Sequence, residues 1–190
     1  METIYGETMD GTVRSYKNWS TSDADYSTNY FPQMRRGVSP AALSVNYTSD
    51  TERNIAIRCT QYNWGGTNKT IWWNRVFMTF DTSGVTVAPL DGTLNIYGYS
   101  QAQGDVIGMR SEHGDTLASG DFDAIYGCSS QTAASDGDGT GTFASCGTTY
   151  TDEIETWNTS GYNEFTLTAG ALSDMAEFDE FKICLMNADY

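Results

Sequence analysis

Hydrophobic and polar residues alternate in short runs along this chain, which is the pattern of β-strands and not of helices. The clearest run is 71–81. One of its faces holds Trp72, Asn74, Val76, Met78 and Phe80, and the other holds Ile71, Trp73, Arg75, Phe77 and Thr79. Because the first face is more apolar, we expect it to face the core, with Phe80 buried. On the second face, Arg75 should pair with a carboxylate or with strand-end carbonyls.

Weaker alternation predicts further strands. Residues 53–62 and 181–186 each place three apolar side chains on one face. Other candidates are 11–16, 92–100, 162–168 and 105–110, the last of which is interrupted by Gly108. A short helix is predicted at 169–175 alone.

The fold expected from these elements is all-β, an antiparallel β-sandwich or jelly roll with long loops and at most one short helix. A chain of 190 residues suits one domain spanning 1–190. Two long loops are expected within it. The first, about 17–52, is polar and carries scattered aromatic rings, and the second, about 129–149, has low complexity.

Net charge is −15, and it is unevenly distributed. The chain through Arg75 is nearly neutral, whereas the part from Val76 onward has only Arg110 and Lys182 against 18 acidic residues. Such a field repels phosphate backbones, so we expect no nucleic-acid partner. The simplest explanation of the negative charge is solubility. The alternatives are docking on a basic partner or collection of divalent cations. No window predicts a membrane helix, and the N-terminus lacks the pattern of a secretory signal.

The four cysteines do not have the spacing of a zinc site with the single histidine, His113. Cys59 and Cys184 lie in alternating apolar runs and are expected to be buried and reduced. Cys128 and Cys146 flank a polar loop, and a disulfide between them would close that loop if the compartment is oxidising.

Catalytic motifs are not evident, and we expect a protein that is not an enzyme. His113 lies between Glu112 and Asp115 in a segment bounded by glycine, which is more typical of a surface turn than of a catalytic triad. The acidic run 152–155 beside Trp157 could supply a glycosidase pair, but a solvated edge is the simpler interpretation.

Binding chemistry is suggested by aromatic residues, which make up 13% of the chain. The candidate exposed rings are Trp64, Trp72, Trp73 and Trp157, which could hold sugar rings or a partner subunit. The alternative is that Trp72 or Trp73 fills the core. Asp136 and Asp138 resemble half of a calcium loop, the only cofactor that the sequence suggests, and a flexible loop is the alternative.

Three stretches carry a resemblance to a known group of modules. They are RVFMTFDTSGV at 75–85, GTLNIYGYS at 92–100 and YTDEIETWNTSGYNEFTLTAGAL at 150–172. Together they resemble β-sandwich modules of the DNRLRE or disaggregatase-related type, which are similar in build to carbohydrate-binding modules. In that group a further strand usually follows the segment matching FKICLMNADY, so a longer polypeptide or a neighbouring subunit would complete the sheet.

The resemblance implies a phage virion surface protein, such as a capsid decoration or head-fibre subunit, that acts in assembly, stabilisation or adhesion. The implied partners are further copies of the chain in a homo-oligomer, most simply a trimer, then the major capsid or another virion protein, and host surface glycans. The implied location is the virion surface or the extracellular space. The alternative is a secreted bacterial carbohydrate-binding module.

Overall fold

The computed structural model describes residue 4 and residues 11–20, 42–46, 58–64, 68–98, 105–127 and 147–188. Within these ranges, the backbone alone is described for 16–20, 42–46, 58–64 and 68–72. The elements, in chain order, are β1 (Gly11–Ser20), β2 (Ala42–Asn46), β3 (Arg58–Trp64), β4 (Asn68–Asp81), β5 (Thr93–Tyr97), β6 (Val106–Arg110), the 3-10 helix η2 (Ser119–Asp123), β7 (Tyr162–Thr166), α3 (Ala169–Glu177) and β8 (Glu180–Asn187). The described part is therefore mostly strand with one short α-helix, as the alternation predicts.

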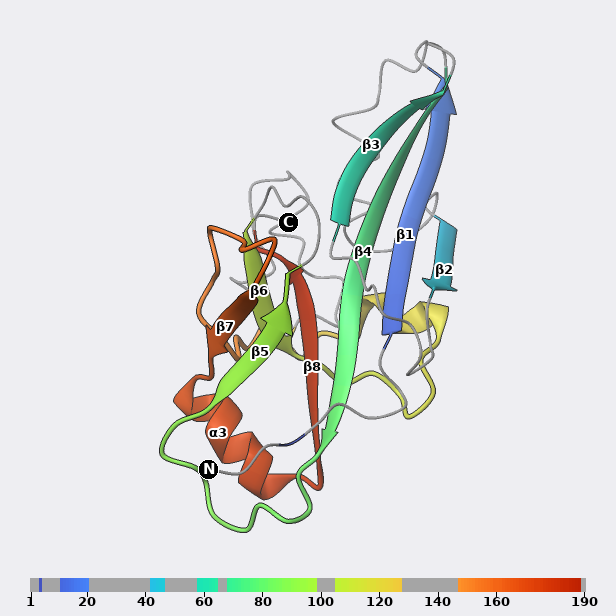
Figure 1. Ribbon diagram of the computed structural model, residues 1–190. Helices are drawn as coiled ribbons and strands as arrows, with labels where there is room; N and C mark the ends of the chain where they lie inside the picture. Colours follow the sequence, from blue (N-terminus) through green and yellow to red (C-terminus); the bar gives the residue numbers. More distant parts are fainter. Residues whose placement is uncertain are drawn as a thin grey trace.

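Strand β4 organises the larger sheet, whose order is β2-β1-β4-β8-β6 (Figure 1). One edge of β4 pairs antiparallel with β1. The other edge is shared: β3 pairs with its first half, from Asn68 to Asn74, and β8 pairs with its second half, from Val76 to Asp81. A strand of 14 residues is long enough to pair with two shorter strands, one after the other, along the same edge.

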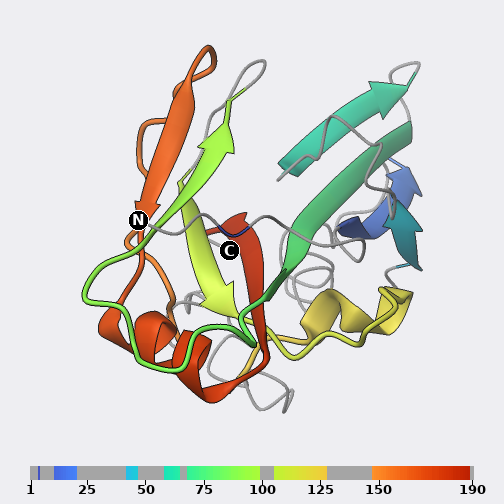
Figure 2. The ribbon, with the colours of Figure 1, turned by 60° about the horizontal axis from the view of Figure 1, so that its bottom comes forward.

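One face of the β4–β8 pair meets a second, smaller sheet made of β5 and β7 (Figure 2). These two strands form a ribbon, and α3 lies next to it at the same side of the larger sheet. The shared core is apolar and is drawn from both sheets and the helix. Its buried members are Val76, Met78, Val106, Tyr150, Phe165, Ala171, Phe181, Ile183 and Leu185. The three apolar side chains that the sequence places on one face of 181–186 all belong to this core.

The opposite face of the same strand pair is covered as well. Phe77 is fully buried, and Arg75 and Thr79 are 4% and 1% exposed. Their cover is the segment 111–125, which contains η2 and lies on the other side of the sheet from the ribbon (Figure 2). The prediction of one core face was therefore incomplete, because alternation cannot show whether a distant loop covers the second face.

Phe80 corrects another prediction. It is only half-buried, with its ring tilted against Phe181 at a centroid distance of 6.3 Å. It packs at the border of the core because β4 ends at Asp81 and the chain then turns outward.

Strand boundaries show where local pattern succeeds and fails. Elements β6, β7 and α3 begin and end within two residues of the predicted segments, and β5 lies inside the predicted segment 92–100. However, β1 continues to Ser20, and β2 lies inside the predicted loop 17–52, so that prediction was wrong at both places. Both strands are stabilised by pairing with distant partners, β2 with β1 and β1 with β4.

Gly108 interrupts the apolar run of β6 for a packing reason. A Cβ atom there would lie 2.8 Å from both Ile183 Cδ1 and Thr151 Cγ2. The Gly108 amide donates to Thr151 Oγ1 at 2.8 Å, so the threonine cannot move away without losing this bond. The glycine thus permits a close approach of the 147–154 segment to β6.

Cys184 is a free, fully buried cysteine, as predicted. Burial raises the pKa of its thiol to about 12. Cys59 lies in β3, where the backbone alone is described, whereas Cys128 and Cys146 lie outside the described residues. The same holds for most of the predicted loop 129–149, although Thr149 at its end forms a β-bridge with Met109.

We predict that Phe77 and Phe80, on opposite faces of β4, contribute unequally to the stability of the fold. Phe77→Ala should lower the free energy of unfolding by about 3 to 5 kcal/mol, because a fully buried ring leaves a cavity. Phe80→Ala should cost clearly less, because its ring is already partly solvated. Urea denaturation of both variants measures the difference, and a loss for Phe80→Ala equal to that for Phe77→Ala would contradict this arrangement.

Candidate functional site

His113 is the one side chain of this sequence suited to acid–base chemistry near neutral pH, so its surroundings come first. The chain leaves β6, forms a bridge between Ser111 and Ile125, and folds back over the sheet. This places His113 inside the molecule with 1% of its surface exposed. The prediction of a surface turn was wrong, because the loop is packed onto β4 and not extended into solvent.

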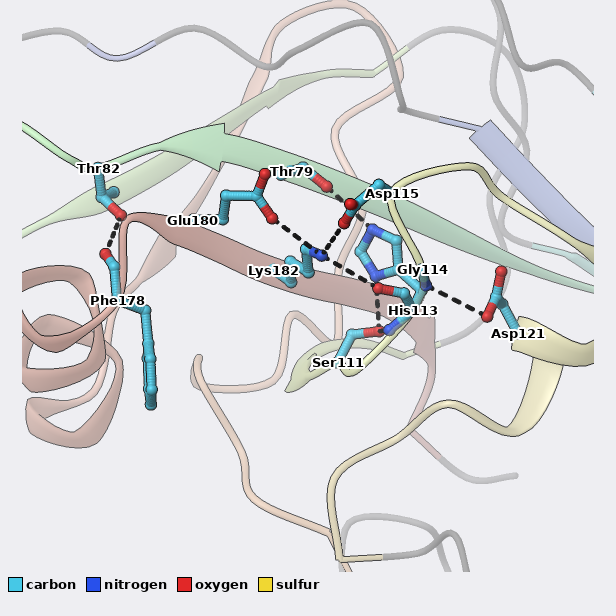
Figure 3. Close-up of polar contacts among 10 residues, drawn as sticks. All are labelled: Thr79, Thr82, Ser111, His113, Gly114, Asp115, Asp121, Phe178, Glu180 and Lys182. Carbon is cyan, nitrogen blue, oxygen red and sulfur yellow. Dashed lines mark hydrogen bonds and ion pairs between the residues drawn. The ribbon is translucent and has the colours of Figure 1, made fainter.

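Both ring nitrogens of His113 have partners (Figure 3). Nε2 lies 3.0 Å from Thr79 Oγ1, and Nδ1 lies 2.9 Å from Ser111 Oγ. The Ser111 hydroxyl donates its proton to the Ala124 carbonyl at 2.9 Å, so it must accept from Nδ1–H. The network therefore assigns the proton to Nδ1 and leaves Nε2 to accept from Thr79. The ring edge also meets Phe77, at 5.3 Å between centroids.

Lys182 fastens the same loop from the neighbouring strand β8. Its Nζ lies 3.2 Å from the His113 carbonyl oxygen, 3.1 Å from Asp115 and 2.9 Å from Glu180 (Figure 3). Burial acts to lower the pKa of Lys182, but hydrogen bonds with Glu180 and Asp115 outweigh it, and the pKa is raised. The lysine thus stays charged where it neutralises these carboxylates.

Two further groups hold the segment in place. The Asp121 carboxylate accepts from the amides of Gly114, at 3.3 Å, and Ala118, at 2.7 Å. Arg75 reaches from β4 to the Phe122 carbonyl at 2.5 Å and to Asp123 at 3.2 Å, with its guanidinium 4.1 Å from the centroid of the Phe122 ring. The predicted pairing of Arg75 with a carboxylate and a carbonyl is confirmed.

This cluster is closed. Burial, followed by the charge of Lys182, lowers the pKa of His113 to about 4, so the ring is neutral at pH 7. Its nitrogens are occupied and its edges are covered, which leaves a substrate no approach to either nitrogen. The cluster therefore has the geometry of a structural contact that holds the 111–125 segment on the β4–β8 pair.

A second polar cluster connects α3 to β6. Arg110 forms an ion pair with Asp174 at 3.0 Å, and its guanidinium lies 3.9 Å and 5.1 Å from the ring centroids of Tyr126 and Phe178. Tyr150 donates to the same Asp174 carboxylate at 2.5 Å. Burial and this hydrogen bond raise the pKa of Tyr150, which keeps its hydroxyl protonated. Arg110 and Lys182, the only cations after Arg75, are therefore both in ion pairs.

Among the described residues, an accessible face lies on the β5–β7 ribbon. Burial alternates along both strands, so each sends every second side chain outward. Cross-strand pairing sets the outward residues opposite one another as Thr93 with Thr166, Asn95 with Glu164 and Tyr97 with Tyr162. We call these six residues the ribbon face.

An exposed tyrosine pair lies at one end of the ribbon face. Tyr97 and Tyr162 are 59% and 64% exposed, and their ring planes stand at 89° with centroids 5.3 Å apart. Edge-to-face contact of this kind is a favoured aromatic arrangement. The Tyr97 hydroxyl also donates to the Ser160 carbonyl at 3.1 Å, which fixes the far end of its ring.

Buried polar contacts stiffen this end of the ribbon. The Asn163 side chain is 4% exposed and donates to the carbonyls of Ile96 and Asn158, while its own oxygen accepts from the Asn158 amide at 2.8 Å. Gly98 follows Tyr97 and approaches so closely that an added Cβ would overlap the Asn158 carbonyl oxygen. The tyrosine pair therefore stands at the paired ends of two strands that these contacts hold in place.

Of the four tryptophans predicted to bind from the sequence, the structure describes the side chains of Trp73 and Trp157. Trp73 is 5% exposed, so this residue fills the interior and is not an exposed binding ring. Trp157 is half-buried against Phe165, at 6.2 Å between centroids. Trp64 and Trp72 lie at strand positions for which the backbone alone is described. The sequence prediction missed Tyr97 and Tyr162, although alternation with Leu94 and Ile96 already places Tyr97 outward.

Asp136 and Asp138, the calcium candidates, lie outside the described residues. Within the described ranges, no group of three or more His, Cys, Asp or Glu side chains is arranged to hold a metal ion. A membrane-spanning helix is also missing from the part of the chain that the structure describes.

We predict that His113 makes stability depend on pH. An unfolded histidine has a pKa near 6.5, and the folded value of about 4 means that the unfolded state binds the proton more readily. The stabilisation is complete above about pH 6.5 and is lost as the pH falls toward about 4, for a total of about 3 kcal/mol. Urea unfolding over this interval, with His113→Gln as the non-titrating control, isolates this group from the carboxylates. Identical pH profiles for the two proteins would contradict the prediction.

Comparison with known proteins found no match among protein-family models, curated proteins or solved structures. The likeness to DNRLRE-type modules therefore depends on the sequence motifs alone.

Proposed function

We propose that this chain is a non-enzymatic surface module of a phage virion, a capsid decoration or head-fibre subunit that acts in assembly, stabilisation or adhesion. The observation that carries the binding role is the ribbon face, where two tyrosines are largely exposed at the paired ends of β5 and β7. The virion setting is supported by the motif resemblance. The proposed location is the virion surface or the extracellular space, with no nucleic-acid partner and no insertion into a membrane.

The non-enzymatic part of the proposal is supported by the state of the candidate catalytic groups. His113 is enclosed with both nitrogens occupied. The acidic run after Thr151 places Asp152, Glu153 and Glu155 at the surface, as expected of a solvated edge. Glycan cleavage that disappears in Glu153→Gln or Glu155→Gln, with the fold intact, would overturn this part.

Self-association is supported by apolar side chains on the loop between β4 and β5. Val87 is 78% exposed and Leu90 is fully exposed, and the loop runs beside α3 at the lower end of the molecule (Figure 1). Exposed apolar side chains of this size become buried where subunits come into contact. We propose a homo-oligomer, most simply a trimer, whose further partner is the major capsid or another virion protein.

The alternative is a secreted bacterial carbohydrate-binding module, and one observation favours it. The ribbon face combines aromatic rings with an amide, a carboxylate and two hydroxyls, which are the groups that hold sugars. Such modules are usually monomers, so the oligomeric state separates the two functions.

We predict that the chain sediments as a homo-oligomer at micromolar concentration. The double variant Val87→Ser/Leu90→Ser should shift the distribution toward monomer without lowering the thermal midpoint, because both side chains are solvated in the single subunit. Thr86→Ser, on the same exposed loop, is the matched control and should leave the oligomer unchanged. A purely monomeric wild-type chain would refute the assembly role and favour the carbohydrate-binding module.

A further inference from the structure

We infer that the ribbon face is a binding site for uncharged or amino-bearing glycans, with Tyr97 and Tyr162 as the contact for a sugar ring. This inference rests on the proposed function of the chain as a binding module and names the ligand class of its exposed face. It concerns residues different from the tryptophans that the sequence pattern suggested.

The first argument is shape. Two ring planes at 89°, with centroids 5.3 Å apart, form a corner in which one ring supports a flat ligand and the other limits its position. The hydrogen bond from Tyr97 to Ser160 and the buried Asn163 keep this corner in place without the ligand. Preorganised aromatic side chains lose little conformational entropy on binding, so even a weak stacking contact is retained as affinity.

The second argument is the order of polar groups along the ribbon. Neighbouring outward positions on one strand are about 7 Å apart. Asn95 and Glu164 follow the tyrosine pair, and Thr93 and Thr166 follow them. This row offers donors and acceptors in succession beside a ring contact, and its length suits a short oligosaccharide better than a single sugar. All six side chains belong to strands, which position them more firmly than loops would.

The third argument is charge. Glu164 is the only charged residue among the six that form the ribbon face. Arg110 and Lys182 are already held in ion pairs with Asp174, Asp115 and Glu180. On these six residues, sialylated, sulfated or uronic-acid glycans therefore meet only negative charge, whereas hydroxyls and protonated amino groups find acceptors. Charge complementarity thus selects uncharged or amino-bearing sugars.

A panel of immobilised oligosaccharides tests the inference on the full chain. The panel contains neutral glycans, glycans with free amino groups, and sialylated, sulfated and uronic-acid glycans. We expect binding to members of the first two groups and none to the acidic group. Tyr97→Ala and Tyr162→Ala should each weaken binding about tenfold or more, which corresponds to the loss of a ring contact.

Matched variants separate a lost contact from a lost fold. Tyr97→Phe keeps the ring and should keep most of the binding, although it removes the bond to Ser160. Glu164→Gln leaves the ribbon intact and should reduce the preference for amino-bearing over neutral glycans. Tyr126→Ala removes a partly exposed tyrosine that lies over Arg110 and is not one of the six ribbon-face residues, so it should leave binding unchanged.

The outcomes for the inference and for the proposed function are distinct. A chain that assembles but binds nothing on the panel overturns the glycan site and leaves the assembly role standing. Binding that survives both Tyr→Ala variants, or that favours acidic glycans, also overturns it. Tyrosine variants that dissociate the oligomer without any glycan binding would show that this face contacts a second copy. A monomer that binds neutral glycans through the tyrosine pair supports the site and refutes the virion subunit.

Discussion

Burial of the β4–β8 pair on both faces is the constraint on which the rest of the described structure depends. A strand covered on one face can send its polar side chains to water, but a strand covered on both must find a partner for each of them. Strand β4 carries Arg75 and Thr79 on its second face, and both are matched from the 111–125 segment. The fold therefore requires the polar contacts of that segment.

This requirement explains why local pattern predicted so much of the chain and missed particular parts. Periodicity depends on neighbours two residues apart, so it located β4 to β8 and the inward side chains of β8. It could not find β2, whose existence depends on pairing with β1, or the cover supplied to Phe77 by a loop. The all-β class is confirmed, while the arrangement as a sandwich or jelly roll and the virion role stay predictions.

The candidate site shows the same division. That Tyr97 points outward follows from its alternation with Leu94 and Ile96. That it meets Tyr162 does not, because β5 and β7 are far apart in sequence and their register is set by the fold. His113 illustrates the reverse error, since flanking charges suggested solvent where tertiary packing created an interior. Charged neighbours at Glu112 and Asp115 remain at the surface while the ring between them turns inward.

The two sides of the β4–β8 pair thus differ in character. The 111–125 side is held by short, directional contacts among neutral and charged groups, and its one histidine is removed from solvent. The ribbon side is joined through an apolar core and presents an exposed outer surface. The closely bonded 111–125 segment and the ribbon with its exposed outer surface lie on opposite sides of the β4–β8 pair. The first can therefore be held tightly without blocking access to the second.

The position of β8 has a consequence for how the chain reaches its fold. It is the last described strand in sequence, yet it lies between β4 and β6 in the sheet. Until β8 has been synthesised, the second half of one edge of β4, from Val76 to Asp81, and one edge of β6 lack their partner in the final order, and the apolar side chains that β8 supplies to the core are missing. Closing a sheet by its final strand requires contacts of large sequence separation, which form slowly. Nascent chains with open strand edges are prone to pair with one another, so synthesis of this protein should depend on protection of its half-built sheet until the last strand arrives.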